Sequence, residues 1–260
     1  MKKTLIGMAV ALSVTACGGG SSSGGDAAGY VTVKSEKAVN ISQEQGAPQC
    51  RVCLTLASAK NGSHAQAINE AIARQLLNLE GVADLQQAAD SFASKYTKDY
   101  QQNMAPLYRE DRSDPEKRAW YEYHYNITGE ARKGRKDVTV YTAIIDYYEG
   151  GAHGINQKLI LNFDEKTGQQ LTLRDVFVPG YESTLNELLQ QKLIENTGAK
   201  DMNDLRAKGY LYSMEMFAPE NFALDEDGIT FIYNPYEIAP YEKGMTELTL
   251  ENEELEALWK

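Results

Sequence analysis

Stretches in which apolar and polar residues alternate predict that much of the chain is β-sheet. Alternation with a period of two is typical of strands that bury one face. The clearest case is a long antiparallel hairpin formed by residues 120–128 and 137–148, with 129–136 as its turn. Further strands are expected at 30–41, 49–57, 155–163, 228–233 and 245–250.

Apolar residues spaced three and four positions apart predict helices between these strands. They are expected at 64–79, 84–104 and 181–196, with a short acidic helix at 251–259. Asp84 is a good N-cap for the second helix, and Pro106 is expected to end it, because proline interrupts helical hydrogen bonding. Gly198 is expected to stop the third helix.

The order of these elements predicts the fold class. Strands and helices that come in separate runs indicate an α+β fold rather than a doubly wound parallel sheet. We therefore expect an α+β protein with antiparallel sheets and with helices packed on one side. A charged, loop-like stretch near 106–118 is expected to separate two intimately packed subdomains, 30–115 and 116–260.

The first residues have the features of a bacterial lipoprotein signal. Lys2 and Lys3 precede a short apolar stretch, 5–14, which is too short to span a bilayer permanently. The sequence Val-Thr-Ala-Cys that follows matches a lipobox. Residues 1–16 are thus predicted to be a signal peptide, and Cys17 to carry a diacylglycerol and a third acyl chain, which together give stable anchoring. The alternative is an ordinary secretory signal cleaved after an alanine.

The residues after the anchor indicate a location. Residues 17–29 comprise the lipid anchor and a Gly/Ser-rich tether that holds the folded part away from the membrane. Gly18 follows the anchor where an aspartate would favour retention at the inner membrane. The expected location is therefore the cell envelope, at the outer membrane of a Gram-negative bacterium and facing the periplasm.

The charge balance excludes one class of partner. The chain has 37 acidic and 26 basic residues, a formal net charge of −11, and loss of residues 1–16 leaves 24 basic residues and a charge of −13. A nucleic-acid-binding protein needs a basic face to replace the phosphate counterions. We therefore expect no nucleic-acid partner, and we expect partners that are basic or neutral.

Cys50 and Cys53 form a C-x-x-C pair, which suits a redox motif, half of a zinc site or a local disulfide. Their surroundings predict a strand, in which positions i and i+3 face opposite sides, so the two sulfurs cannot meet without a bulge. No second C-x-x-C or histidine pair completes a metal site. We favour unpaired packing cysteines, with a strained local disulfide as the main alternative.

His153 is the histidine in the most unusual setting. It lies in the sequence Gly-Gly-Ala-His-Gly, and the glycines allow backbone conformations that few residues tolerate. Asp146 and Glu149 are near enough in sequence to orient its imidazole. His153 is either a site histidine or part of a shape-determining turn in which it hydrogen-bonds the backbone, and we favour the turn.

No known catalytic motif accompanies this histidine. H-E-x-x-H, P-loop and G-x-G-x-x-G sequences are all missing from the chain. The acidic turns at 164–165 and 225–228 do not fit an EF-hand loop and are expected to be solvated. The sequence therefore predicts no metal and no cofactor, and it favours a binding protein over an enzyme.

The loop 234–244 is the candidate binding segment. Two prolines stiffen it, and Tyr236 and Tyr241 project from it beside Glu237 and Pro240. Rigid aromatic loops lose little entropy on binding, which makes them good anchors. Most of the 16 tyrosines are expected to cover sheets, but these two are candidate binding residues together with Glu237, Pro240 and His153.

Four motifs in the second half of the chain resemble a known family. They are Gly-Gly-Ala-His at 150–153, Asn-Phe-Asp at 162–164 with Thr-Gly at 167–168, Leu-Thr-Leu-Arg-Asp-Val-Phe at 171–177, and Tyr-x-x-Tyr-Glu-Ile-Ala-Pro-Tyr-x-x-Gly at 233–244. In this order they resemble the C-terminal extracellular domain of RsiV-type proteins, a family of unknown function. Residues 30–130 resemble the domain that precedes it there, which also occurs in the peptidoglycan deacetylase PdaC outside its catalytic domain.

The resemblance implies a binding function. RsiV-type proteins are anti-sigma factors whose extracellular part binds lysozyme, so loop 234–244 and the neighbourhood of His153 would be contact surface. This chain departs from them, because a lipobox takes the place of the membrane span and the sigma-binding segment. We expect a lipid-anchored envelope binding module for a lysozyme-like protein or for peptidoglycan. The alternatives are an envelope hydrolase acting on glycan or ester bonds through His153 and a carboxylate, and a structural lipoprotein.

Overall fold

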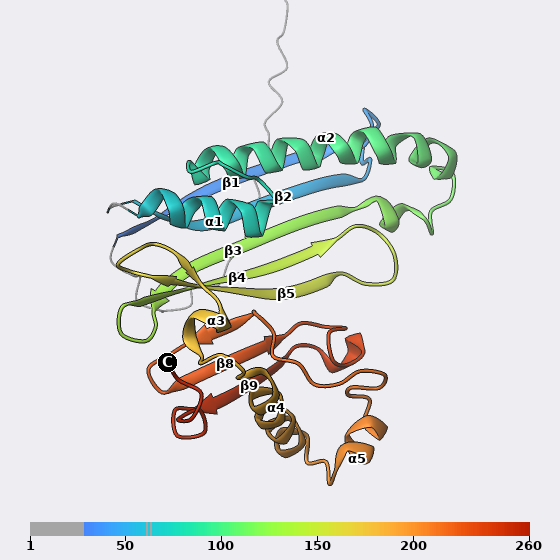
Figure 1. The fold of residues 1–260 in the computed structure, drawn as a ribbon. Helices are drawn as coiled ribbons and strands as arrows, with labels where there is room; N and C mark the ends of the chain where they lie inside the picture. Colours follow the sequence, from blue (N-terminus) through green and yellow to red (C-terminus); the bar gives the residue numbers. More distant parts are fainter. Residues whose placement is uncertain (1–28, 61, 63) are drawn as a thin grey trace, which may run out of the picture.

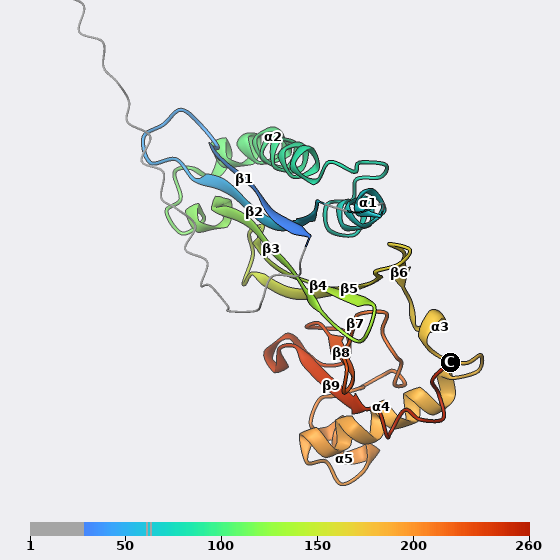
Figure 2. The ribbon, with the colours of Figure 1, turned by 90° about the vertical axis from the view of Figure 1, so that its left-hand side faces the viewer.

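The computed structural model describes residues 29–60, 62 and 64–260. Helices and sheets are stacked in layers: two helices, a six-stranded sheet, a three-stranded sheet and a further group of helices (Figures 1 and 2). This arrangement confirms the predicted α+β class. The predicted signal peptide and Cys17 lie outside the described residues, and none of the helices within them is long and apolar enough to cross a membrane.

The larger sheet contains six strands in sequence order. They are β1 (Tyr30–Asn40), β2 (Gln49–Ala59), β3 (Tyr123–Lys133), β4 (Val138–Tyr148), β5 (Ile155–Asp164) and β6 (Gln170–Leu171). All neighbours are antiparallel except β2 and β3, which are parallel, with Cys50 opposite Tyr123. This one pair departs from the antiparallel arrangement that was expected. Two helices connect these strands and carry the chain back to the same end of the sheet, as a parallel pair requires.

The helices α1 (Ala65–Leu77) and α2 (Leu85–Asp111) cover one face of this sheet (Figure 2). The Asp84 carboxylate caps α2 by accepting the Gln87 N–H at 3.0 Å. The helix continues through Pro106, so the predicted end is wrong. Pro106 is exposed, and water can bond the carbonyl that the proline leaves without a donor. Buried Tyr108 holds the last turns against the Tyr121 ring, 5.3 Å away.

The hairpin of β3 and β4 is confirmed, with different limits for β3. Trp120 lies before the strand, in the 3-10 helix η1 (Arg118–Tyr121). At its other end β3 continues into the predicted turn, because Lys133 still pairs with Thr139. The turn itself is shorter than predicted and includes Asp137 at a φ of 63°.

The second sheet is antiparallel and belongs to the C-terminal part. Its strands are β7 (Phe222–Leu224), β8 (Gly228–Tyr233) and β9 (Thr246–Glu251), accompanied by α3 (Leu173–Val176), α4 (Glu182–Thr197), α5 (Met202–Ala207) and the 3-10 helix η2 (Tyr241–Lys243). Gly198 ends α4 at a φ of 62°, as predicted.

The predicted acidic helix at 251–259 is wrong, because this segment is a series of turns. Leu255 and Leu258 are buried, and the chain end then pairs with the segment after α3. Trp259 forms a β-bridge with Phe177, and the Val178 N–H donates to the Leu258 carbonyl at 2.9 Å. Because these backbone bonds hold the C-terminal residues in an extended conformation, the same residues cannot be helical.

The two buried clusters share strands β4 and β5. Tyr141 and Leu161 point into the core under α1 and α2. Their neighbours Val140 and Ile160 point the other way, into the core that the second sheet forms with α3, α4 and α5. Successive residues of a strand face opposite sides, so one sheet serves two cores. The sheet also continues across the predicted boundary at residue 115, and the division into subdomains stays a prediction.

Asn162 joins the two sheets. It lies in β5 and is 1% exposed. Its side chain donates to the Phe222 carbonyl at 2.7 Å and accepts the Leu224 N–H at 3.0 Å, both in β7. One amide therefore satisfies a donor and an acceptor of an edge strand.

Two further asparagines bond the backbone of β5. Asn221 accepts the Ile160 N–H and donates to the Lys158 carbonyl, each at 2.8 Å. Asn234 accepts the Lys158 N–H at 2.8 Å and donates to the same carbonyl at 3.1 Å. β6 pairs only with the last part of β5, so these side chains take the place of a neighbouring strand.

The two cysteines of β2 do not bond to each other. Cys50 is a free thiol that is fully buried, and burial raises its pKa to about 12. Cys53 points to the other face of the strand. The expectation of an unpaired packing cysteine is thus confirmed for Cys50, and because its thiol is free, a local disulfide between the two cysteines is excluded.

Replacing Asn162 tests the junction between the sheets. Asn162→Ala leaves the Phe222 carbonyl and the Leu224 N–H buried without partners, so we expect the free energy of unfolding to fall by about 2–4 kcal/mol. Urea denaturation measures it. The control is Asn103→Ala on the exposed side of α2, which should change stability by less than about 0.5 kcal/mol. Equal small losses for the two variants would contradict the role of Asn162.

Candidate functional site

Two loops that are far apart in the sequence meet at one end of the molecule, on the right in Figure 1. One follows β4 and carries His153, and the other follows β8 and carries Tyr236 and Tyr241. The His153 ring stacks on the Tyr241 ring with centroids 3.8 Å apart and an angle of 17°. The Tyr236 ring lies 5.6 Å from Tyr241 and 6.5 Å from His153. We call these three residues the ring cluster.

Hydrogen bonds fix the imidazole in one orientation. The Gly154 carbonyl lies 3.0 Å from His153 Nδ1 and also accepts the Tyr241 hydroxyl at 2.8 Å. A carbonyl can only accept, so Nδ1 carries the proton, and Nε2 accepts the Tyr236 hydroxyl at 3.2 Å. His153 thus bonds the backbone of its own turn, as one of the two interpretations expected, and also contacts the other loop.

Tyr236 adopts a backbone conformation that is unusual for a large side chain. Its φ is 75°, and its side chain is 60% exposed. The Glu237 N–H donates to the Asn234 carbonyl at 3.1 Å and closes a turn in which Pro235 and Tyr236 are the central residues. Glycine is preferred at the second central position of such a turn, and a larger residue costs about 1–2 kcal/mol. Strain of this kind is concentrated at functional sites.

Glu237 and Pro240 shape the loop around the rings. The Glu237 carboxylate accepts the Asn234 N–H at 2.8 Å, and its partial burial raises its pKa. Pro240 precedes η2, and its carbonyl accepts the Lys243 N–H at 3.0 Å. Both residues are exposed on the same loop as the tyrosines, and the structure places all five predicted binding residues in one neighbourhood.

The carboxylates that were expected to orient His153 have other partners. Asp146 accepts His124 Nε2 at 3.1 Å, on the open face of the sheet. Glu149 accepts the Tyr96 hydroxyl at 2.6 Å. Burial, and then this carboxylate, raise the pKa of Tyr96. His153 therefore forms no hydrolytic dyad with Asp146 or Glu149. The alternative function, an envelope hydrolase, lacks the carboxylate that it was expected to use.

The pair of His124 and Asp146 was missed by sequence reasoning. Alternation in β3 places His124 opposite to Tyr125, whose ring packs against α2, and so predicts that His124 faces away from the helices. The register of the hairpin adds that His124 lies opposite Tyr148. The length of the turn sets that register, and the predicted turn was too long.

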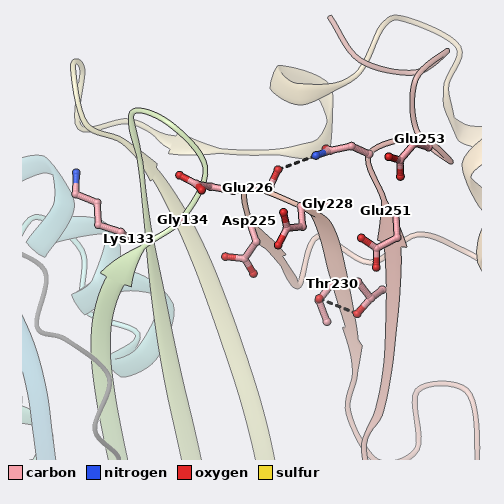
Figure 3. A pocket seen from close by; sticks show the side chains of 11 residues that line it. Lys133, Gly134, Asp225, Glu226, Gly228, Thr230, Glu251 and Glu253 are labelled. Carbon is pink, nitrogen blue, oxygen red and sulfur yellow. Dashed lines mark hydrogen bonds between the residues drawn. The ribbon is translucent and has the colours of Figure 1, made fainter.

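An acidic pocket of about 820 Å³ lies beyond the other end of β8 (Figure 3). Its lining residues are Lys133, Gly134, Asp225, Glu226, Asp227, Gly228, Thr230, Thr249, Glu251, Asn252 and Glu253. Two of its charged side chains already have partners. Asp225 pairs with both terminal nitrogens of Arg132, one of them at 2.9 Å, and Lys133 pairs with Glu165 at 2.8 Å.

The described residues offer no cluster of three or more His, Cys, Asp or Glu side chains that could hold a metal ion. The acidic pocket is also separated from the ring cluster by the length of β8. The ring cluster therefore remains the candidate functional site.

Comparisons with known proteins describe the C-terminal part and the fold. Residues 174–253 match a family model described as "Protein of unknown function (DUF3298)". These residues therefore carry a DUF3298 domain, which contains loop 234–244. No curated protein gives a significant match to the chain.

Two solved structures are similar over most of the chain. A member of the DUF3298 family from Bacteroides fragilis is 27% identical, with a TM-score of 0.81, covering 89% of this chain and 93% of the other. A DUF3298 family protein from Pseudomonas aeruginosa PAO1 is 16% identical, with a TM-score of 0.60, covering 89% and 94%. The second likeness shows the fold alone.

Two adjacent glycines test how the loop positions His153. Gly150 and Gly151 have φ values of 85° and 91°, but a Cβ at Gly150 would lie 2.8 Å from the Trp120 carbonyl oxygen, whereas Gly151 has free space. Gly151→Ala should lower stability by about 1 kcal/mol through backbone strain alone. Gly150→Ala should cost about 2–4 kcal/mol, because the overlap adds to the strain. Thermal unfolding compares them, and equal losses would contradict this loop geometry.

Proposed function

We propose that the protein is a lipid-anchored binding module of the cell envelope and that the ring cluster is its binding surface. The observation that carries the proposal is the exposed Tyr236 ring, held in a strained backbone conformation beside two other rings. An exposed ring that lowers stability is retained only if it contributes elsewhere. Binding a ligand is the simplest such contribution, because the ring is already fixed in place.

The charge around the rings favours a basic partner. Glu237 and Glu242 are exposed on the same loop, and the chain has a net charge of −11. Complementary charge speeds association and raises specificity. The RsiV-type motifs at 150–153 and 233–244 form the ring cluster and its surroundings, and in that family the extracellular part binds lysozyme. A lysozyme-like protein is therefore the first ligand to test, and peptidoglycan is the second.

The envelope location rests on the N-terminal sequence. Lys2, Lys3, the apolar stretch and the lipobox at Cys17 together support export and acylation. The Gly/Ser-rich residues after Cys17 support a tethered domain that reaches ligands at some distance from the membrane. We place the protein at the outer membrane, facing the periplasm.

The hydrolase alternative has less support. Both nitrogens of His153 are engaged by uncharged groups, the Gly154 carbonyl and the Tyr236 hydroxyl. A general base needs a nitrogen that can take a proton from water or substrate and a group that stabilises the resulting charge. The two nearest acidic residues in the sequence bond elsewhere.

Binding to a C-type lysozyme tests the proposed surface. We expect the full-length protein to bind at moderate salt and more weakly as salt rises. Tyr236→Ala should weaken binding by about 2 kcal/mol, roughly 30-fold, as for an aromatic hot spot. Tyr241→Ala should weaken it as well, because the ring also holds His153. Isothermal titration calorimetry measures these affinities.

The control for these variants is Val31→Ala, an apolar side chain that is 40% exposed at the far end of β1 and should not affect binding. If the wild-type protein does not bind lysozyme, the lysozyme version of the proposal is wrong. If the wild-type protein binds lysozyme and the two tyrosine variants bind it equally well, the ring cluster is not the binding surface.

Mass spectrometry tests the anchor. The N-terminal peptide of protein extracted from membranes should begin at Cys17 and carry three acyl chains, and Cys17→Ser should release the protein into the soluble envelope fraction. Recovery of Cys17 unmodified, or with its sulfur in a disulfide, would contradict lipidation, because the acylated thiol cannot form a second bond. A substitution in the tether, Ser22→Ala, is the control and should leave acylation intact.

A further inference from the structure

We infer that the ring cluster is one end of a longer binding row across the part of β3 and β4 that faces away from α1 and α2, and that this row binds an extended, uncharged glycan. This inference rests on the proposed function and names the ligand class for the same site. It adds His124, Tyr148 and Arg51 to the residues that contact the ligand.

A second pair of rings lies on the sheet next to the ring cluster. His124 in β3 and Tyr148 in β4 are directly opposite in the strand register. Their rings stack with centroids 6.3 Å apart and an angle of 26°. The neighbouring Tyr125 and Tyr147 pack toward α2, so His124 and Tyr148 face away from the helices. Both are partly exposed.

The loop after β4 connects the two sets of rings. The Tyr148 hydroxyl donates to the Gly151 carbonyl at 2.9 Å. A Cβ added at Gly154 would lie 3.8 Å from the Tyr148 Cβ, and His153 is the residue before Gly154. The row therefore runs His124, Tyr148, His153, Tyr241, Tyr236, from the sheet to the outer loop.

Planar polar side chains accompany the rings on the sheet. Asp146 accepts His124 Nε2 at 3.1 Å and the Asn126 side-chain amide at 3.3 Å. Arg51 in β2 lies beside His124 in the register and is exposed. These groups supply donors and acceptors with fixed directions next to aromatic faces.

This combination suits a sugar chain. The C–H groups of a pyranose ring carry partial positive charge and pack on the negative face of an aromatic ring, while hydroxyl and acetamido groups bond planar side chains at its edge. Arg51 and Asp146 have opposite charges, so this part of the row does not select a charged ligand. An open row that crosses strands and ends on a loop fits a linear molecule better than a small compact one, which would occupy an enclosed cavity.

Chitooligosaccharides of increasing length test the row. We expect the full-length protein, purified in mild detergent, to bind chitopentaose more tightly than chitotriose and chitobiose, because a longer chain covers more rings. His124→Ala and Tyr148→Ala should each weaken pentaose binding about tenfold, and Tyr236→Ala should do the same from the other end. The matched control is Thr128→Ala, exposed on the same face of β3 about 13 Å from His124, which should have no effect.

The outcomes separate this inference from the proposed function. If lysozyme binds through Tyr236 and no oligosaccharide binds, the ligand class is wrong and the binding surface stands. If oligosaccharides bind and His124→Ala and Tyr148→Ala have no effect, the row is wrong and the ring cluster alone is the site. If neither lysozyme nor oligosaccharide binds, both proposals fail. Unchanged unfolding midpoints for His124→Ala and Tyr148→Ala, measured in parallel, assign lost binding to the missing ring.

Discussion

The outer edge of β5 has backbone groups that must be hydrogen-bonded, and the way in which they are bonded determines how the molecule is assembled. β6 reaches only the last residues of β5, and side chains of Asn221 and Asn234 satisfy Lys158 and Ile160. Asn221 immediately precedes β7, and Asn234 immediately follows β8. The second sheet is therefore attached to the first by the residues that delimit its own strands. An unpaired buried backbone group is costly, so this attachment leaves little freedom for the sheets to slide.

The same attachment sets the separation of the two loops that form the ring cluster. Loop 234–244 begins at Asn234, which is bonded to β5, and the loop that carries His153 ends where β5 begins. A fixed distance along β5 therefore separates the two loops, and the stack of His153 on Tyr241 depends on it. At the opposite end, the ion pair of Arg132 with Asp225 and the bond from the Arg135 N–H to the Leu224 carbonyl hold β7 to the β3–β4 hairpin. The sheets are thus fixed at both ends.

Most strands, the long helices and the α+β class could be predicted from the sequence, because each depends on a local period. Pairing between distant segments could not. Alternation of apolar and polar residues in β2 and β3 predicts which residues share a face of the sheet. It does not predict that the two strands are parallel, because their direction depends on the path of the chain through α1 and α2. The predicted helix end at Pro106 and the predicted helix at 251–259 were wrong for a related reason, because tertiary contacts override local preference. Tyr108 packs beyond Pro106, and Leu255 and Trp259 are held by contacts of the chain end. At the candidate site, the aromatic residues and the two prolines of loop 234–244 were enough to identify Tyr236 and Tyr241 from the sequence. The place of His124 beside Tyr148 depends on the register of the β3–β4 hairpin, which the sequence alone did not determine.

The left-handed conformation of Tyr236 has a consequence for the evolution of proteins with this fold. Glycine or asparagine at this position would be favoured by stability alone. Relatives that keep the fold but no longer use the loop should therefore drift toward glycine or asparagine here, since nothing opposes the gain in stability. Relatives that still bind should retain an aromatic residue in spite of the strain. A single position in the loop would then distinguish the two groups in a set of sequences, without any knowledge of the ligand.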